Sequence, residues 1–571
     1  MKRTVSGGII LVMVGLAASP VFAAAESDSD ILRDKGLQPL VLPFLKARPE
    51  VVEAWKDMHF GMFICWGPVT LTGLEIGWSR GRGRREQKQG GRGPTPAEVY
   101  DSLYKKWKPG KFDARAWVKV AQDSGARYII FLVKHHDGFC LYDTKLTDYR
   151  STGPESAWKV DVLKAVADAC HETGVKLIVY YSQPDWHHPD YRTENHARYI
   201  EFLHGQIREI LTKYGRIDGL WFDLGGRPKD WDSEDLFWMA RDIQPWLIIN
   251  NRCGLPGDFD TPEQRLGRFQ IERPWETCMT LGTQWSWKPD DTLKSLKQCI
   301  DALVTCAARG GNLALNTNPM PDGQIEPRQA ERFREIGQWL RKYGESIYGT
   351  RGGPFRSAHW GGATHRADTI YIHVLAWPEQ GVTLPPIPTK IVAHSLLTGG
   401  AVAVAQTDQG IEIEVPPGDR QELDTIVALT LDAPAGEIEP MPYRSESLAF
   451  GKKVTASSVW GPGYEPEMAC DDDEETTRWG AAAGSRCGWL EIDLGAEGTF
   501  SRSLINEEGW NRIEAFELQY AEGDSWRTFA RGTAVGRLEL EFQPVTARRV
   551  RLNILEANDV PTIWEFQLFR E

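Results

Sequence analysis

Short apolar runs alternate with longer amphipathic segments over the first part of the chain. The apolar runs are 59–66 (HFGMFICW), 126–134 (ARYIIFLVK), 175–182 (VKLIVYYS), 217–223 (IDGLWFD), 245–250 (PWLIIN) and 311–316 (GNLALN). Runs that are apolar without alternation predict strands buried on both faces of a parallel sheet. The segments 112–125, 161–174 and 195–215 have a helical pattern, and each ends in a glycine that is typical of a helix C-terminus.

Repeated strand–helix units predict a (β/α)8-like barrel, which we assign to residues 24–348. A doubly wound sheet is the alternative, but it predicts a GxGxxG turn, and none follows the first strand. Beyond the barrel, short strand-like runs between Pro and Gly turns predict a small β-sandwich over 349–438 and a second β-sandwich over 439–571. The expected fold class is therefore α/β, a (β/α)8-like barrel followed by two β-sandwich domains.

The first 23 residues differ from the rest of the chain. Lys2 and Arg3 precede an apolar run that ends in small residues at Ala23, which predicts a secretory signal peptide over residues 1–23. No later stretch is long and apolar enough to span a membrane. We therefore expect an exported protein, periplasmic or secreted. Nothing in the sequence indicates its oligomeric state.

Composition narrows the range of partners. A net charge of −13 argues against nucleic acid. The 23 tryptophans suit stacking on sugar rings, although large cores use tryptophan as well. Nine cysteines are too few for a disulfide framework in a chain of 571 residues.

Polar and aromatic residues lie at the ends of the predicted barrel strands. They are Cys65, Trp66, His135, His136, Tyr180, Trp221 and Asp223. The active site of such a barrel lies at the carboxyl ends of its strands, so these side chains are expected to converge on one rim. Adjacent residues of a strand point to opposite faces. Both histidines can therefore face the rim only where the strand has ended; otherwise one points to the helix layer.

Asp223 follows the apolar residues GLWF, so its carboxylate is costly to bury unless it is hydrogen-bonded or used in catalysis. One carboxylate with imidazoles and aromatic rings around it suits a neutral, hydroxyl-rich substrate. If that substrate is a glycoside, its hydrolysis normally needs a second carboxyl group. Glu263 and Glu276, which follow the fifth strand, are the candidates for an acid whose pKa is raised by desolvation. Glu276 is equally suited to hold Arg273 or a loop amide.

The motifs FGMFICWGP, KHHDGF, YYSQPDWHHPDY, LWFD and RPWETCMT, the last followed by QWSW, occur in this order between about residues 50 and 350. Together they resemble the α-L-fucosidases of glycoside hydrolase family 29. The resemblance implies a retaining hydrolase of α-L-fucosides with Asp223 as nucleophile and Glu263 as acid/base, Glu276 being the alternative. It implies no cofactor for catalysis. The substrate-binding residues it implies are Cys65, Trp66, Glu75, Trp78, His135, His136, Tyr180 and Trp221.

One position departs from the family pattern. The family has His in its HWG motif, where this chain has Cys65, and a thiol is a weak donor and acceptor for a sugar hydroxyl. Three interpretations follow: a pocket altered for a related sugar such as L-galactose, replacement of the histidine by another residue, or weak activity.

The C-terminal residues MACDDDEETTRW, WLEIDLG and PVTARRVRLNI resemble the discoidin, or F5/8 type C, modules. Such modules commonly bind glycans and often hold a structural Ca²⁺. The resemblance implies Asp471 and Asp473 as Ca²⁺ ligands, but the acidic run is one residue longer than usual. An acidic surface turn is the alternative.

The sequence thus predicts an exported, exo-acting, retaining glycoside hydrolase that releases α-L-fucose or a related L-sugar from fucosylated glycans. The alternatives are an α-L-galactosidase-type variant of the same pocket and a non-catalytic glycan-binding protein. A metal hydrolase is the third alternative, disfavoured because no third ligand lies near the histidine pair in the sequence.

Overall fold

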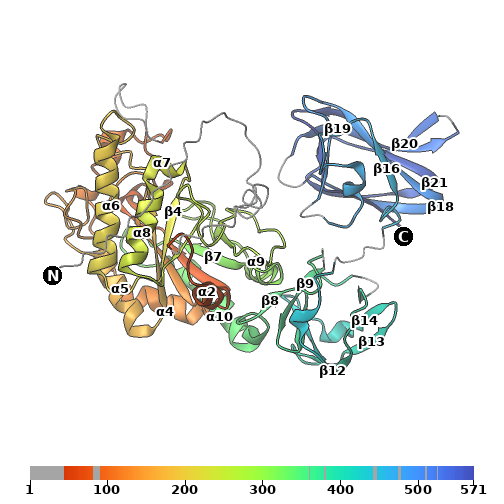
Figure 1. The fold of residues 1–571 in the computed structure, drawn as a ribbon, viewed down its shortest axis with the longest axis horizontal. Helices are drawn as coiled ribbons and strands as arrows, with labels where there is room; N and C mark the ends of the chain where they lie inside the picture. The colour runs from red at the N-terminus through yellow and green to blue at the C-terminus, as the bar shows by residue number, and fades with distance from the viewer. Residues whose placement is uncertain are drawn as a thin grey trace, which may run out of the picture.

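The computed structural model describes residues 44–81, 91–358, 360–378, 381–441, 447–473, 477–507, 511–523 and 525–570. The expected signal peptide, residues 1–23, lies outside this part of the chain. Among the described residues, no helix has the length and apolar character needed to cross a membrane. Figure 1 shows a body of helices around a sheet, followed by two bodies built of strands.

The first body is built on a parallel sheet of seven strands. They are β1 (Phe60–Ile64), β2 (Tyr128–Lys134), β3 (Lys176–Ser182), β4 (Gly219–Asp223), β5 (Ile248–Ile249), β6 (Glu276–Thr280) and β7 (Asn312–Thr317), in the order β5-β4-β3-β2-β1-β7-β6. Parallel bridges join residues of segment 258–263 to the end of β5 at Asn250 and to β6 at Cys278. This segment takes the eighth position between the two edge strands. The expected barrel is therefore confirmed, with one irregular position.

Helices follow the strands around the outside of the barrel (Figure 1). They are α2 (Pro49–Lys56), α3 (Ala97–Tyr100), α4 (Ala114–Ser124), α5 (Val162–Thr173), α6 (His196–Lys213), α7 (Pro228–Trp231), α8 (Ser233–Ile243), α9 (Leu296–Ala308) and α10 (Pro327–Tyr343). Local signals set their ends. The Asp113 side chain caps α4 by accepting from two backbone N–H groups, and Gly125 ends that helix in the left-handed conformation at φ 81°.

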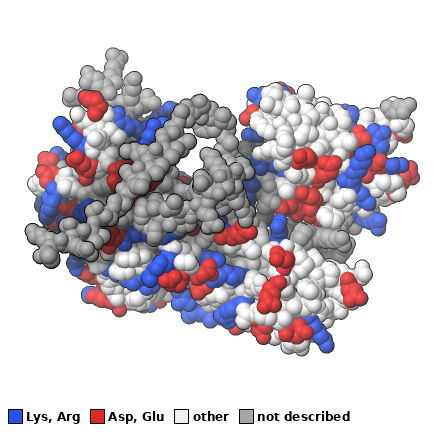
Figure 2. All heavy atoms as spheres, viewed as in Figure 1, with Lys and Arg blue, Asp and Glu red and all other residues white. Residues whose placement is uncertain are grey.

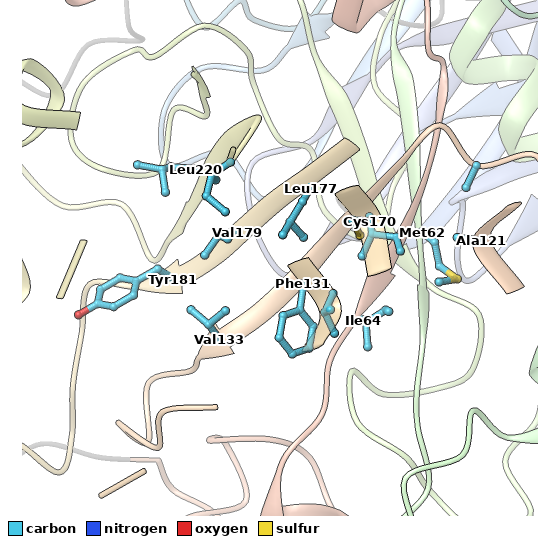
Figure 3. Packing of buried hydrophobic residues seen from close by; sticks show 14 of the residues in the cluster. Met62, Ile64, Ala121, Phe131, Val133, Cys170, Leu177, Val179, Tyr181 and Leu220 are labelled. Carbon is cyan, nitrogen blue, oxygen red and sulfur yellow. The ribbon is translucent and has the colours of Figure 1, made fainter. Parts of the chain in front are cut away.

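Alternation along the strands separates two cores. Met62 and Ile64 of β1 point outward with Phe131 and Val133 of β2, toward α4 and α5, and Figure 3 shows this packing. The residues between them, such as Phe63, point inward to a smaller core inside the barrel. Residues at the strand ends inherit this alternation, which decides which side chains reach the inner rim.

Two antiparallel bodies follow the barrel. The first has a sheet of β8 (Arg351–Gly352), β9 (Gly361–Arg366), β10 (Thr369–Val374), β12 (Ile391–Leu396) and β15 (Thr425–Leu431), and a sheet of β11 (Val382–Leu384), β13 (Ala403–Thr407) and β14 (Gly410–Glu414). Two of its residues, Tyr371 and Ile426, belong to the outer core of the barrel, so these two bodies are packed together.

The C-terminal body has a core of its own. Its larger sheet contains β16 (Lys453–Ala456), β18 (Gly488–Asn506), β19 (Ile513–Glu522), β20 (Ser525–Gly532), β21 (Arg537–Ala557) and β23 (Glu565–Phe569), and its smaller sheet contains β17 (Trp479–Gly480) and β22 (Thr562–Ile563). Together with the middle body it confirms the β-sandwich architecture expected after the barrel.

Charged side chains of both signs are interspersed over the face shown in Figure 2. The described residues that are visible on that face therefore do not form one acidic patch. All nine cysteines are free, and eight of them are buried. Packing rather than disulfide bonds holds the described part of the fold.

Candidate active site

The Asp223 carboxylate lies at the carboxyl end of β4, beside the end of β3. Its Oδ2 accepts a hydrogen bond from the Tyr180 hydroxyl at 2.6 Å, and its Oδ1 accepts one from Arg252 Nη1 at 2.8 Å. Oδ1 also accepts from the backbone N–H of Leu224 at 2.7 Å. These bonds hold both oxygens in fixed positions at the strand end.

The same neighbours keep Asp223 ionised. Burial by itself raises the pKa of this carboxyl, but His136, Arg252 and Tyr180 together outweigh burial and lower the pKa to about 2. A carboxylate that stays ionised at neutral pH in a mostly buried position is chemically suited to act as a nucleophile.

The two adjacent histidines follow β2, and both face this carboxylate. The strand ends at Lys134, so strand alternation no longer separates them. The ring of His135 stacks on Tyr180 with centroids 5.9 Å apart, and His136 Nε2 lies 3.5 Å from Asp223 Oδ2. The sequence left two arrangements open: the strand has ended at the histidine pair, or one histidine points to the helix layer. The structure has the first.

Ser182 decides which nitrogen of His136 carries the proton. The Ser182 hydroxyl donates to the Pro184 carbonyl at 2.8 Å, so it accepts from His136 Nδ1 at 2.6 Å. Burial lowers the pKa of His136 to about 4, against the opposing effect of Asp223. The neutral ring therefore has an unprotonated Nε2 on the Asp223 side, which can accept a hydrogen bond from a hydroxyl group.

The remaining polar residues after β2 support the loop. Lys134 forms a buried ion pair with Asp185 at 3.1 Å, and the Tyr100 hydroxyl donates to Asp137 at 2.7 Å. Gly138 has φ 83°, and a Cβ there would lie 2.3 Å from Asp185 Oδ1. This close approach requires glycine and brings the loop against the segment that follows β3.

Glu263 lies on the segment that fills the eighth barrel position. Its Oε2 accepts a hydrogen bond from Arg252 Nη1 at 2.8 Å, the same nitrogen that binds Asp223. The two carboxylate oxygens are therefore no further apart than twice this distance. The Arg252 guanidinium also lies 4.7 Å from the ring centroid of Trp221. Arg252 thus joins both candidate carboxylates to the floor of the site.

Sequence reasoning missed Arg252. A signal for it was present, because Arg252 follows the predicted strand PWLIIN as closely as the histidines follow theirs. It also missed Gln183, whose side chain accepts from the Asp223 backbone N–H at 2.7 Å and donates to the Arg252 carbonyl at 2.5 Å. Amide side chains in a polar loop have no sequence pattern that distinguishes this role.

Glu276 is part of strand β6 and not of a loop, which corrects the sequence interpretation. Its side chain is fully buried beneath the site, where it accepts hydrogen bonds from the Tyr128 hydroxyl and from Trp221 Nε1 at 3.0 Å. Burial raises its pKa to about 7. Both oxygens are engaged below the pocket, so Glu276 supports Trp221 and does not reach a reacting group. It binds neither Arg273 nor a loop amide.

Three other predicted residues lie around the same rim. Trp78 is half-exposed, with its ring 5.3 Å from that of His136. Both oxygens of Glu75 accept backbone N–H groups at 2.8 Å, from Ile76 and from Trp285, and burial raises its pKa. Cys65 points into the inner core, and burial raises the pKa of its thiol well above the ordinary value. Cys65 therefore lies in the site as a neutral thiol.

Trp66 lies on the other side of the sheet, and its predicted contact with substrate is wrong. It is the residue after Cys65, so it points outward, where it is fully buried. Its indole donates to the Met320 carbonyl at 3.0 Å and packs 4.4 Å from Trp107 and 5.0 Å from Trp117. Trp66 is a core residue between the barrel and its outer layer.

Among the residues that the structure describes, one group of side chains could hold a metal ion, and it lies in this site. Ligand atoms of His135, His136 and Asp223 lie within 4.8 Å of one another, so Asp223 is the third ligand that the local sequence did not reveal. The Asp223 oxygens are already bound by Tyr180 and by the cationic Arg252. A cation at this position would face an arginine across the same carboxylate, which disfavours metal binding.

The two predicted Ca²⁺ ligands differ in their surroundings. Asp473 is paired with Arg356 at 2.9 Å, which does not fit a ligand of a cation. Asp471 is partly buried, its side chain accepts from Thr477, and its backbone N–H donates to the buried Glu565 at 3.1 Å. Asp471 and Glu565 supply the oxygen ligands that Ca²⁺ prefers, so Asp471 fits the ion and Asp473 does not.

Comparisons with known proteins agree with this geometry. The model of the α-L-fucosidase family matches residues 45–345, and that of the F5/8 type C domain matches residues 453–566. Human tissue α-L-fucosidase is 26% identical over 414 residues, which cover 66% of this chain and 87% of that protein.

Two solved structures are also similar. The α-L-fucosidase isoenzyme 1 of Paenibacillus thiaminolyticus is 31% identical with a TM-score of 0.60, and the match covers 67% of this chain and 99% of that one. A GH29 α-L-fucosidase of Bacteroides thetaiotaomicron is 25% identical with a TM-score of 0.59, and the match covers 68% of this chain and 97% of that one. That structure is a covalent intermediate trapped with 2-fluoro-fucosyl fluoride in a Glu-to-Gln mutant. This chain belongs to the α-L-fucosidase family of glycoside hydrolases and carries an F5/8 type C domain at its C-terminus.

Proposed function

We propose that this protein is an exo-acting α-L-fucosidase that retains the anomeric configuration through a covalent intermediate on Asp223. One observation carries the proposal: Arg252 Nη1 lies 2.8 Å from an oxygen of Asp223 and 2.8 Å from an oxygen of Glu263. One oxygen of each carboxylate therefore lies no further from the other than twice this distance, which is compatible with the separation of about 5–5.5 Å typical of retaining enzymes and shorter than the roughly 6.5–9.5 Å that inverting enzymes need.

In the first step an Asp223 oxygen attacks C1 of the fucosyl unit while the bond from C1 to the leaving oxygen breaks. The Glu263 carboxyl group gives its proton to that oxygen, and the aglycone leaves as an alcohol. In the second step Glu263 takes a proton from water, and the water oxygen attacks C1. The ester bond breaks, Asp223 returns as a carboxylate, and α-L-fucose is released.

The surrounding residues support these roles. Asp223 is ionised and held in place, as a nucleophile needs to be. Glu263 has a 40% exposed side chain, so that water reaches it for the second step. His136 Nε2, the Trp78 ring and the stacked pair of Tyr180 and Trp221 supply acceptors and flat surfaces for a sugar. The Bacteroides enzyme forms a covalent fucosyl intermediate, as its structure describes, which favours the same chemistry here.

Trapping tests this proposal on the intact protein. Incubation with 2-fluoro-fucosyl fluoride should add one 2-fluoro-fucosyl group, and peptide mass spectrometry should locate it on Asp223. Proton NMR of an aryl α-L-fucoside reaction should show α-L-fucose as the first product. Label on another residue would exclude Asp223 as the nucleophile, and β-L-fucose as the first product would exclude retention.

The proposal extends to export and to a structural ion. A charged start, an apolar run and small residues at Ala23 support secretion with removal of residues 1–23. N-terminal sequencing of protein recovered outside the cytoplasm should begin after Ala23. Asp471 and Glu565 support a Ca²⁺ site in the C-terminal domain. Added Ca²⁺ should raise the melting temperature of the wild type but not of Asp471→Ala.

A further inference from the structure

The loop that carries Glu263 contains a strained turn. Gln264, the next residue, has φ 55°, a left-handed conformation that is unfavourable for a residue other than glycine. Its backbone N–H donates to the Cys278 carbonyl of β6 at 2.9 Å. Among the described residues, the Glu263 side chain itself is paired with Arg252 alone. Strand β6 also holds the loop beyond the turn, where the Thr277 hydroxyl donates to the Arg265 carbonyl at 3.2 Å and accepts from the Gly267 backbone N–H at 3.0 Å. The orientation of this carboxyl therefore depends on these barrel contacts and on what supports the loop after Gly267.

The C-terminal domain contacts this loop just beyond the turn. The Arg268 guanidinium lies 4.3 Å from the ring centroid of Trp564, a residue of the F5/8 type C domain. The next residue, Phe269, lies with its ring centroid 5.3 Å from the Arg356 guanidinium, and Arg356 pairs with Asp473 of the same domain at 2.9 Å. Phe269 and Trp564 are 8% and 5% exposed, so their rings are covered in the assembled chain.

These contacts join two bodies that have separate cores. The barrel and the C-terminal domain contribute to different hydrophobic clusters, so neither core is completed by the contact. A cation–π contact and a partly exposed ion pair are each weak compared with the stability of a domain. Their loss would therefore leave both domains folded and remove the support of the loop at Arg268 and Phe269, whereas the bonds to β6 would remain.

We propose that the C-terminal domain positions the acid/base of this enzyme, with Arg268 and Trp564 as positioning residues for the loop of Glu263. This inference rests on the proposed role of Glu263. It assigns to the domain a function in proton transfer, separate from any glycan that it binds. A shift of this loop by about 1 Å would slow proton donation substantially without altering the Asp223 site, which is built on a strand.

The leaving group separates proton donation from other effects. From a 2,4-dinitrophenyl α-L-fucoside, the phenolate leaves without being protonated. From a 4-methoxyphenyl α-L-fucoside, the leaving oxygen must receive a proton from the acid. For Arg268→Ala and for Trp564→Leu in the full chain, we expect kcat/KM on the 4-methoxyphenyl substrate to fall about 10- to 100-fold. On the 2,4-dinitrophenyl substrate it should stay within about twofold. The double variant should lose less than the product of the two single losses, because the contact between Arg268 and Trp564 is removed in each; Trp564 also contacts Arg478, at 4.8 Å.

Arg265→Ala is the matched control. Arg265 is exposed on the same loop, and no described contact joins its side chain to the C-terminal domain. This variant should keep the wild-type ratio between the two substrates. Arg268→Lys should lose less than Arg268→Ala, since lysine keeps the positive charge near the ring.

Several results would overturn the inference. Equal losses on both substrates would mean general damage to the site, and unchanged rates on both would mean that the contact has no role. If Glu263→Gln lowers kcat/KM equally on the two substrates, Glu263 is not the acid/base. The inference, which rests on that role, would then fail as well. If Glu263→Gln shows the dependence and both Arg268→Ala and Trp564→Leu do not, the proposed function stands and the role of the C-terminal domain is excluded.

Discussion

The two carboxylates joined by Arg252 come from different kinds of structure. Asp223 ends a regular strand, has a side chain only 14% exposed, and is bound by Tyr180, Arg252 and a backbone N–H group. Glu263 lies on an irregular segment that replaces a strand, and its side chain is 40% exposed. The fold thus fixes one group through the sheet and the other through a loop and a shared arginine.

This difference corresponds to different chemical demands. A nucleophile must stay ionised and in line with C1, which a buried strand end with fixed donors provides. An acid/base exchanges protons with the leaving group and then with water, which a more exposed loop permits. The comparison predicts that substitution of Asp223 lowers kcat/KM for every substrate. Substitution of Glu263 should lower it most for substrates whose leaving group must be protonated.

The largest effect is expected for Asp223→Ala. Without the nucleophile, kcat/KM on aryl α-L-fucosides should fall about 10⁴-fold or more for every leaving group. Azide should restore part of the rate and give β-L-fucosyl azide, because a small anion can occupy the space of the carboxylate. A folded variant that kept wild-type turnover would remove Asp223 from this role. Loss of wild-type activity in EDTA would instead favour a metal at the histidine pair.

Glu263→Gln should have the second largest effect and should separate the two carboxylates. On substrates with poor leaving groups kcat/KM should fall about 10²- to 10⁴-fold, the range that general acid catalysis supplies. On 2,4-dinitrophenyl α-L-fucoside the loss in kcat/KM should be much smaller, because this leaving group needs no proton. The same substitution at Glu276 is the control and should show no such dependence.

Sequence analysis named the residues on the regular strands of this site and Glu263 on the irregular segment, but it missed Arg252 and Gln183. Tyr180 and Asp223 lie near the ends of strands with clear apolar runs, and the histidine pair follows another such strand, so their convergence on one rim followed from the barrel alone. The error at Trp66 has a simple physical cause. Strand alternation continues past the end of β1 and turns this residue outward, although the family motif contains it.

Strand β6 shows why the rest was harder to predict. Its sequence ETCMT mixes polar and apolar residues, yet every position is buried, because Glu276 is satisfied by Tyr128 and Trp221 inside the barrel. Hydrophobic periodicity cannot identify a strand whose buried groups are polar. The bridging role of Arg252 likewise depends on two segments that meet only in the folded chain.

The third prediction concerns stability and tests the assignment of Glu276 below the pocket. Burial raises its pKa to about 7 from an ordinary value of 4.5, so the folded protein holds a proton that the unfolded chain releases between these pH values. Stability from this group is therefore present at low pH and lost as pH rises through that window, by about 3 kcal/mol in total.

Glu276→Gln removes this titration, and an amide can still accept from Trp221 Nε1 and donate to the Tyr128 oxygen. From pH 4.5 to pH 8, the free energy of unfolding of the variant should therefore gain about 3 kcal/mol relative to the wild type. Urea unfolding at several pH values measures the difference. Parallel pH profiles would show that Glu276 does not titrate in this window.

The smallest effect is expected at Cys65, where the sugar contact itself is in question. The thiol is buried and neutral, so it offers a substrate hydroxyl only a weak hydrogen bond. Cys65→Ser keeps the shape and adds a stronger partner. If a fucose hydroxyl lies against this position, kcat/KM on an aryl α-L-fucoside should rise by no more than about tenfold, the value of one neutral hydrogen bond.

Cys65→His restores the family residue and should raise the ratio of fucoside to L-galactoside hydrolysis, because a larger side chain leaves less room for a hydroxyl at C6. A wild type that prefers the L-galactoside, with a preference that Cys65→His reverses, would identify the pocket as an α-L-galactosidase variant. If neither substitution changes either rate, Cys65 does not contact the sugar, and another residue binds the hydroxyl that the family histidine would bind. Unlike the first two predictions, this one leaves Asp223 and Glu263 untouched, so it tests the choice of sugar separately from the chemistry.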